Sequence, residues 1–439
     1  MKLVLIGGAG FRVPQVVEAV ARSGPVDEVV LVDTEAGRLR TMLAVVAQLP
    51  MGDRLRVSAS VDLAEALAGA DFVFCAIRVG GTAGRVADER VALELGVLGQ
   101  ETTGPGGLAY ALRTIPVMQD IARTVRAVAP QAWFVNFTNP AGIITEALRP
   151  ILGDRVVGIC DTPIGLMRRA AAAVGARNPE AVSYDYVGLN HLGWLRTLEV
   201  DGTDRLPDLL DSERLHGIEE ARLIGLDWVR QLGALPNEYL FYYYCNREAV
   251  ARIVSAPSTR GEFLAGQQED FYTAAAGRPE DALQLWRATK DQREQTYMAE
   301  ARAADEEREA EDADGGYQAV ALALMTALSG GEATAAIVNV ANSGTVPGLP
   351  EEAVVEVPCD VDAEGVHPRP VAPLTGHMLG LVQSVKAVEQ LTIRAAREHS
   401  SNLAWEAFAT HPLVGSVTIG RRLLDGYRSR IPEIAAVLP

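Results

Sequence analysis

Short apolar runs alternate with longer amphipathic stretches along the first part of the chain. The apolar runs fall within residues 2–6, 27–34, 71–81, 132–142 and 155–163. Their length suits buried strands, and stretches such as Val61–Leu67 and Leu112–Val128 have the residue spacing of helices. Strands that alternate with helices predict a parallel sheet covered by helices on both faces.

From about residue 196 the pattern changes to longer helical stretches. Residues 335–361 indicate a strand, a loop and a second strand, and the chain from Met378 onward has a helical pattern. We therefore predict an α/β protein with an N-terminal Rossmann-like, doubly wound parallel sheet in residues 1–195. Residues 196–439 are predicted to form a C-terminal α+β domain, for substrate binding and oligomerisation, that packs closely on the first.

Charge and cysteine content narrow the class of protein. The 439 residues include 40 basic and 57 acidic side chains, a formal charge of −17, so the surface is expected to repel nucleic acid and anionic membranes. The 4 cysteines are scattered and do not form a disulfide framework, which favours a reducing cytoplasm. The apolar run after Met1 is too short to span a membrane. The acidic run at residues 304–314 is typical of a solvated helix face or loop.

A glycine-rich turn follows the first apolar run. Gly7, Gly8 and Gly10 precede a predicted helix, an arrangement in which the backbone can approach a pyrophosphate. Asp33 ends the second predicted strand, roughly 20 residues later, where an acid holds the adenosine ribose. This context predicts that residues 1–195 bind NAD. The alternative is a tight turn without a ligand, which also needs glycines. The usual third glycine of the motif is replaced by Val13.

Polar side chains gather where the later strands are predicted to end. Arg78, Asn139, Cys160 and Asp161 all lie at such positions, and ligands bind at the carboxyl ends of parallel strands. His191 follows in the stretch "GLNHLGW", and a thiolate with an imidazole makes half of a divalent-metal site. A buried cysteine and a hydrogen-bonded core histidine remain the alternative.

Five longer motifs together resemble one enzyme family. They are "GVLGQETTGPGG" (96–107), "NFTNPAG" (136–142), "CDTPIG" (160–165), "GLNHLGW" (188–194) and "LPNEYLFYYY" (235–244). In this order they are similar to the NAD- and metal-dependent glycosidases of glycoside hydrolase family 4, especially its 6-phospho-glucosidases, which depart from the usual two-carboxylate scheme. The resemblance covers essentially the whole chain.

The resemblance implies roles for residues around the reacting sugar. Cys160 and His191 match the ligands of the metal, usually manganese, and Tyr239 matches the catalytic base that removes the C2 proton after NAD has oxidised C3. Asp161 faces the leaving group as a general acid, with a helix N-cap as the alternative role. Without the family, the tyrosines around Tyr239 would be interpreted as a core stripe.

The resemblance also implies how the substrate is held. Arg85 and Arg260 match positions that bind the sugar 6-phosphate, and Asn139 matches a substrate-binding asparagine. The expected substrate is a phosphorylated disaccharide or glucoside, and an enzyme of this kind is expected to be a homodimer or homotetramer.

Two departures from the family pattern affect the prediction. The cofactor turn has Ala9 and Gly10 in place of Gly-Ser, and Asp161 stands where β-specific members usually have Asn. Overall similarity favours a 6-phospho-β-glucosidase, with a 6-phospho-α-glucosidase as the alternative. A 2-hydroxy-acid dehydrogenase and a nucleotide-sensing regulatory protein are the hypotheses from other classes.

Overall fold

The computed structural model describes residues 1–52, 54–177, 182–298 and 316–439, and the acidic run at 304–314 lies outside the described residues. In the described part, 13 strands form one mixed sheet. Their order is β10-β8-β7-β12-β11-β6-β5-β4-β1-β2-β3, with β13 beside β12 and β9 beside β8. The sheet therefore joins both ends of the sequence into one framework.

One half of this sheet is parallel and belongs to the N-terminal part of the chain. Its strands are β3 (Arg56–Ser60), β2 (Glu28–Val32), β1 (Lys2–Ile6), β4 (Phe72–Cys75), β5 (Trp133–Asn136) and β6 (Val156–Ile159). The helices that alternate with these strands are α1 (Val13–Arg22), α2 (Ala36–Ala47), α3 (Leu63–Leu67), α4 (Gly81–Leu93), α5 (Pro105–Val128), α6 (Ala141–Leu152) and, after β6, α7 (Thr162–Ala173).

Helices cover both faces of the parallel half. Successive residues of β1 divide between two apolar cores, Leu5 in one and Ile6 in the other, as the alternation of side chains along a strand requires. Residues of α1 and α2 belong to the first core, and residues of α5 and α6 belong to the second. The predicted doubly wound Rossmann-like sheet is confirmed.

The other half of the sheet is antiparallel. It contains β11 (Thr334–Ala341), β12 (Val354–Asp362), β7 (Ser183–Leu189), β8 (Leu192–Val200), β10 (Leu235–Pro236), β13 (Gly365–Pro368) and β9 (Thr203–Asp204). The halves meet where β11 pairs with β6, with Val338 opposite Ile159. The domain boundary proposed after residue 195 falls within β8, and the division into two domains stays a prediction.

The remaining helices surround the antiparallel half and the edge of the parallel half. They are α8 (Leu206–Leu210), α9 (Glu219–Ile224), α10 (Leu226–Leu232), α11 (Phe241–Tyr244), α12 (Asn246–Ser255), α13 (Arg260–Gly277), α14 (Ala282–Gln295), α15 (Tyr317–Leu328), α16 (Gly376–Glu398), α17 (Ser401–Thr410), α18 (Val417–Arg430) and α19 (Pro432–Val437). Short 3-10 helices are η1 (Gly153–Arg155), η3 (Glu213–Gly217), η4 (Glu238–Leu240) and η5 (Pro279–Asp281).

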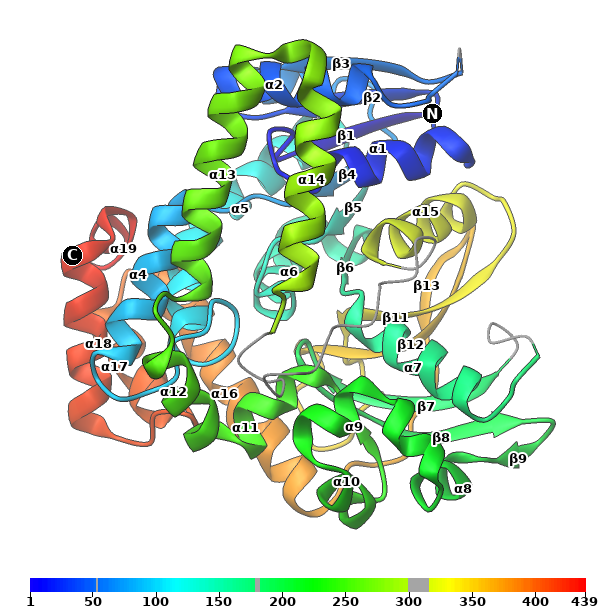
Figure 1. Ribbon diagram of the computed structural model, residues 1–439, viewed down its shortest axis with the longest axis vertical. Helices are drawn as coiled ribbons and strands as arrows, with labels where there is room; N and C mark the ends of the chain where they lie inside the picture. The colour runs from blue at the N-terminus through cyan, green and yellow to red at the C-terminus, as the bar shows by residue number, and fades with distance from the viewer. Residues whose placement is uncertain (53, 178–181, 299–315) are drawn as a thin grey trace.

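Two of these helices return to the N-terminal sheet. Figure 1 shows α13 and α14 as a long pair that reaches α2, and both helices contact α2. The last helices, α18 and α19, pack on α4 and α5. Among the described residues, none of the helices has both the length and the apolar character needed to cross a membrane.

The helix predicted to begin at Leu112 begins at Pro105 instead. The added turns contain Gly106 and Gly107, which usually interrupt a helical pattern. A Cβ atom at Gly106 would lie 2.2 Å from the carbonyl oxygen of Gln100, so the chain can pass this point only as glycine. The glycines in this first turn are therefore required by close packing of the backbone. Helix propensity does not include this effect.

Candidate active site

A cavity of about 2000 Å³ lies along the carboxyl ends of the parallel strands. Nearly all the residues predicted from sequence to act on a ligand contribute to its lining. They are Gly7, Gly10, Asp33, Arg85, Asn139, Cys160, Asp161, His191, Tyr239 and Arg260. Gly8 lies instead against β2, where a Cβ atom would meet the backbone nitrogen of Val32 at 2.7 Å. The cavity thus brings together residues from both halves of the sheet.

The glycine turn packs too closely on its neighbours to accept side chains. Gly7 has a φ of 88°, and a Cβ atom there would lie 2.7 Å from the carbonyl oxygen of Ala76. Asp33 receives backbone hydrogen bonds from Ala9 at 3.0 Å and Glu35 at 3.1 Å. A carboxylate has further lone pairs, so Asp33 can also accept a ribose hydroxyl. The turn and Asp33 therefore fit the pyrophosphate and ribose of a dinucleotide.

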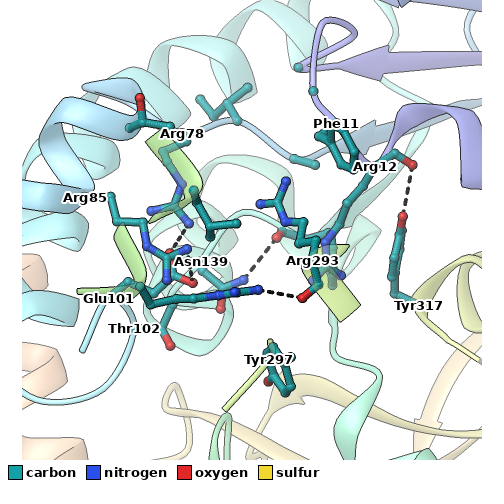
Figure 2. Close-up of a pocket in the computed structure, with 18 of the residues that line it drawn as sticks. Phe11, Arg12, Arg78, Arg85, Glu101, Thr102, Asn139, Arg293, Tyr297 and Tyr317 are labelled. Carbon is teal, nitrogen blue, oxygen red and sulfur yellow. Dashed lines mark hydrogen bonds and ion pairs between the residues drawn. The ribbon is translucent and has the colours of Figure 1, made fainter. Parts of the chain in front are cut away.

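Aromatic side chains from the C-terminal part of the chain hold the same turn. Three of them donate to its carbonyl groups: Tyr272 to Ala9, Trp286 to Phe11 at 2.8 Å and Tyr317 to Arg12 at 3.0 Å. Figure 2 shows the last of these contacts beside the cavity. Because these side chains bond its carbonyl groups, helices α13, α14 and α15 hold the turn in place.

Cys160, His191 and Tyr239 all line the cavity at the seam, where the two halves of the sheet join. Cys160 directly follows β6, and His191 lies in the turn between β7 and β8 with a φ of 64°. The His191 ring stacks on the Tyr239 ring with centroids 3.7 Å apart and planes 9° from parallel. Burial lowers the pKa of His191 to about 3, so the imidazole is neutral and can act as a metal ligand.

Tyr239 continues into a chain of hydrogen bonds. Its hydroxyl lies 3.0 Å from that of Tyr297, and Tyr297 donates to Glu238 Oε1 at 2.8 Å. Burial and the nearby Glu238 carboxylate raise the pKa of Tyr239 well above its usual value. Burial and the neighbouring Glu220 raise the pKa of Glu238 to about 8. A phenol in this setting needs a cationic neighbour before it can act as a base.

Asp161 and Asn139 face the cavity from two strand ends. Asp161 precedes α7 without a side-chain cap hydrogen bond, and Arg12 lies 3.8 Å from its Oδ2 atom. Asn139 precedes a cis peptide bond to Pro140, and its Oδ1 atom is buried with no hydrogen-bond partner in the described structure. The structure places both side chains in the cavity, where each can contact a substrate.

Arginine side chains concentrate at one end of the cavity. Figure 2 shows Arg78, Arg85 and Glu101 on one wall, with Arg12 and Arg293 facing them. Arg85 pairs with Glu89 at 3.0 Å and with Glu101 at 2.9 Å. Although burial opposes ionisation, Arg78 and Arg85 hold the pKa of Glu101 at about 2. Ion pairs with Glu89 and Glu101 therefore hold the arginine side chains of this wall in position.

Arg293 is the functional candidate that sequence reasoning missed. Its Nη1 atom is buried without a hydrogen-bond partner in the part of the chain described, and Arg260 donates to its carbonyl oxygen at 2.7 Å. Burial, with Arg12, Arg85 and Arg260 nearby, lowers the pKa of Arg293 to about 9. A site with this excess of positive charge fits an anion. The surrounding "KDQREQTY" has the pattern of an ordinary charged helix face, so no sequence signal marked it.

The residues at the seam also fit a divalent cation. His191 Nδ1 is buried without a hydrogen-bond partner in the described structure, and a thiol with an imidazole is a donor set that such ions accept. No group of three or more His, Cys, Asp or Glu side chains in the described residues could hold a metal ion. The protein would therefore supply two ligands and leave the other coordination positions to substrate or water.

The fold and the cavity define an α/β protein whose glycine turn fits a dinucleotide, and comparisons with known proteins identify its family. The profile described as "Family 4 glycosyl hydrolase" matches residues 2–176, and that of its C-terminal domain matches residues 186–414. A probable 6-phospho-β-glucosidase of Bacillus subtilis is 30% identical, with 97% of this chain and 95% of the relative covered. The chain belongs to glycosyl hydrolase family 4.

Solved structures extend the comparison to bound ligands. A 6-phospho-β-glucosidase from Thermotoga maritima, solved with manganese, NAD+ and glucose-6-phosphate, has a TM-score of 0.81 at 28% identity over 99% of each chain. A 6-phospho-α-glucosidase from gut microorganisms, in complex with NAD and Mn2+, has a TM-score of 0.80 at 26% identity over 98% of this chain and 97% of that one. The predicted family is confirmed, and the protein is a 6-phospho-glycosidase rather than a 2-hydroxy-acid dehydrogenase or a nucleotide sensor.

Proposed function

We propose that this enzyme hydrolyses the O-glycosidic bond of 6-phospho-glucosides with NAD and a divalent cation, manganese, as cofactors. The observation that carries the proposal is the stacking of Tyr239 on His191 beside Cys160, in the same cavity as the glycine turn. When bound, NAD supplies a hydride acceptor for C3 of the sugar and the cation supplies Lewis acidity, which together make the C2 proton acidic.

The chain's own residues would then move two protons. Tyr239 accepts the C2 proton, and its raised pKa in the absence of a cation means that it becomes a base only beside positive charge. Asp161 donates a proton to the glycosidic oxygen as the bond from C1 breaks, because it lies at the cavity next to Cys160. Water would then add across C1 and C2, with Asp161 taking a proton from the water as its oxygen bonds to C1 and Tyr239 returning a proton to C2, so that both residues regain their starting protonation states. The hydride that restores C3 would come from the bound cofactor, so that each turnover leaves NAD oxidised.

The arginine end of the cavity would bind the 6-phosphate. Arg85 and Arg260 are the predicted contacts, and Arg293 supports the same role because its buried Nη1 atom has no hydrogen-bond partner in the described structure. Asn139 would bind a sugar hydroxyl through its buried Oδ1 atom, which likewise lacks a partner among the described residues. The substrate is therefore held at its phosphate and at its ring.

Preference for the β anomer is the finer part of the proposal. It follows from the motifs "QETTGPGG" and "NFTNPAG", which favour the β branch. Asp161 favours the α branch, because β-specific members usually carry Asn after the metal cysteine. An enzyme that cleaves 6-phospho-α-glucosides is therefore the second candidate.

Turnover of the α and β forms of a nitrophenyl glucoside 6-phosphate tests the proposal. The full-length protein is expected to release nitrophenol only with NAD, Mn2+ and a thiol reductant present, and faster from the β form. The same rate after chelation and removal of NAD would contradict the cofactor requirement. Faster release from the α form would reverse the anomer preference and leave the rest intact.

A further inference from the structure

Glu356 is a carboxylate buried without a countercharge in the centre of the antiparallel half. It lies on β12, is 0% exposed, and accepts hydrogen bonds from Asn190 at 3.2 Å, Asn339 at 3.0 Å and Tyr186 at 3.1 Å. All three donors are neutral, and among the described residues no lysine or arginine forms an ion pair with it. Burial raises the pKa of Glu356 to about 7, and these hydrogen bonds oppose that effect.

The first of these contacts leads to His191 and Asn139. Asn190 immediately precedes His191, and its Oδ1 atom accepts a hydrogen bond from the backbone nitrogen of Ala141 at 3.1 Å. Ala141 begins α6, directly after the Asn139–Pro140 bond. By holding the Asn190 amide, Glu356 fixes the β7–β8 turn against the start of α6, and so fixes where His191 stands.

A second contact leads to Cys160 and Tyr239. Tyr186 accepts a hydrogen bond from Asn237 at 3.5 Å, and Asn237 also donates to Thr162 Oγ1 at 2.7 Å. Thr162 Oγ1 is 3.4 Å from the sulfur of Cys160. The Oδ1 atom of Asn237 accepts from the backbone nitrogen of Tyr239 at 3.0 Å. Glu356 is thus linked to His191 through Asn190, and to Cys160 and Tyr239 through a series of hydrogen bonds that begins at Tyr186.

We propose that Glu356 is a positioning residue that holds the thiol and imidazole ligands in register and supplies negative charge behind the divalent-cation site. The inference depends on the proposed function, because it assumes that Cys160 and His191 bind the cation. A carboxylate with only neutral donors is costly to bury, and a cation at the adjacent ligands offsets that cost. Outer groups that orient metal ligands commonly change metal affinity roughly 10- to 100-fold.

Glu146 provides a matched control. It is also a buried carboxylate, but Lys386 pairs with it at 2.8 Å and Gln390 donates to it at 3.1 Å. Lys386 also pairs with Glu389, but Glu146, unlike Glu356, has a cationic partner within the protein. A Glu146→Gln variant reports the effect of losing a buried carboxylate that has its own countercharge.

The experiment measures the dissociation constant of Mn2+ by electron paramagnetic resonance, in full-length protein with NAD bound. Glu356→Gln is expected to raise this constant roughly 10- to 100-fold while NAD binding, measured separately, changes little. Glu146→Gln is expected to leave Mn2+ affinity within about twofold of wild type. An unchanged Mn2+ affinity in folded Glu356→Gln overturns the inference.

Tyr186→Phe decides the question if Glu356→Gln fails to fold. It keeps the carboxylate but removes the hydroxyl that donates to Glu356 and accepts from Asn237, so a smaller rise in the same constant is expected, and wild-type affinity in this variant counts against the inference. Wild-type protein is measured first. If wild type with NAD fails to bind Mn2+, the proposed function itself is wrong, whereas wild-type binding with unaffected variants rejects only the role of Glu356.

Discussion

The two halves of the sheet contribute to the cavity by different physical means. In the parallel half, the backbone positions the functional groups, because strands that end at one edge bring the glycine turn, Asn139 and Cys160 together. In the antiparallel half, side chains do this work, since His191 and Tyr239 are held by stacking and by hydrogen bonds to buried amides. Both halves therefore contribute proposed reacting groups: Cys160 and Asp161 follow a parallel strand, whereas His191 lies in a turn between antiparallel strands.

Tyr239→Phe tests the group that side-chain contacts hold in the antiparallel half, and it has the largest expected effect. The variant keeps the ring and its stacking on His191 and loses only the hydroxyl. Loss of a general base is expected to lower kcat roughly 10²- to 10⁴-fold. In D2O, wild-type product is expected to carry deuterium at C2, measured by NMR, whereas the variant forms little labelled product. Unlabelled wild-type product would exclude elimination through C2, and an unchanged affinity for NAD is the control.

Arg85→Ala and Arg293→Ala test the binding role with an intermediate effect. Each removes charged hydrogen bonds worth about 1.5–3 kcal/mol, so KM for the phosphorylated glucoside is expected to rise roughly 10- to 100-fold with a smaller change in kcat. KM for the unphosphorylated glucoside should change far less. Arg230→Ala, which removes an arginine paired with Asp227 at 3.1 Å, is the matched control.

The same KM effect on both substrates would mean that these arginines do not bind the phosphate. A fall in kcat with unchanged KM would instead place them in the chemical step.

Trp286→Phe has the smallest expected effect and tests whether a side chain of α14 helps to hold the glycine turn of the parallel half. The variant keeps an aromatic ring beside Phe11 but loses the hydrogen bond to its carbonyl oxygen. We expect about 1 kcal/mol less unfolding free energy and a few-fold weaker NAD binding, measured by calorimetry. Trp405→Phe, which loses a comparable bond to Val417 at 2.9 Å, should affect stability alone. Equal effects of both variants on NAD would show that α14 does not support the turn.

The parallel half was accessible to prediction because its signals are local. Short apolar runs with polar residues at their ends predict the strands and the positions of Asp33, Asn139 and Cys160 from sequence alone. The helix starting at Pro105 was missed because its glycines are required by packing against distant backbone. Propensity describes a residue in isolation, and this contact is formed only in the folded chain.

The antiparallel half contains what the sequence could not reveal. Glu356 stands among apolar neighbours on β12, where alternation would place a polar residue in water, yet both faces of this strand are buried. Its donors come from two distant parts of the chain, Tyr186 and Asn190 from β7 and the turn after it, and Asn339 from β11. Arg293 was likewise missed, because the sequence of a charged helix does not tell which of its side chains are buried against another part of the protein.

The join between β6 and β11 limits how the enzyme can open. Backbone hydrogen bonds run without interruption from β5 through β6 to β11, so the two halves cannot swing apart like the jaws of a clamp without breaking them. Any opening of the cavity must therefore come from the loops and helices that line it, and the sheet beneath them keeps Cys160 and the glycine turn at a constant separation.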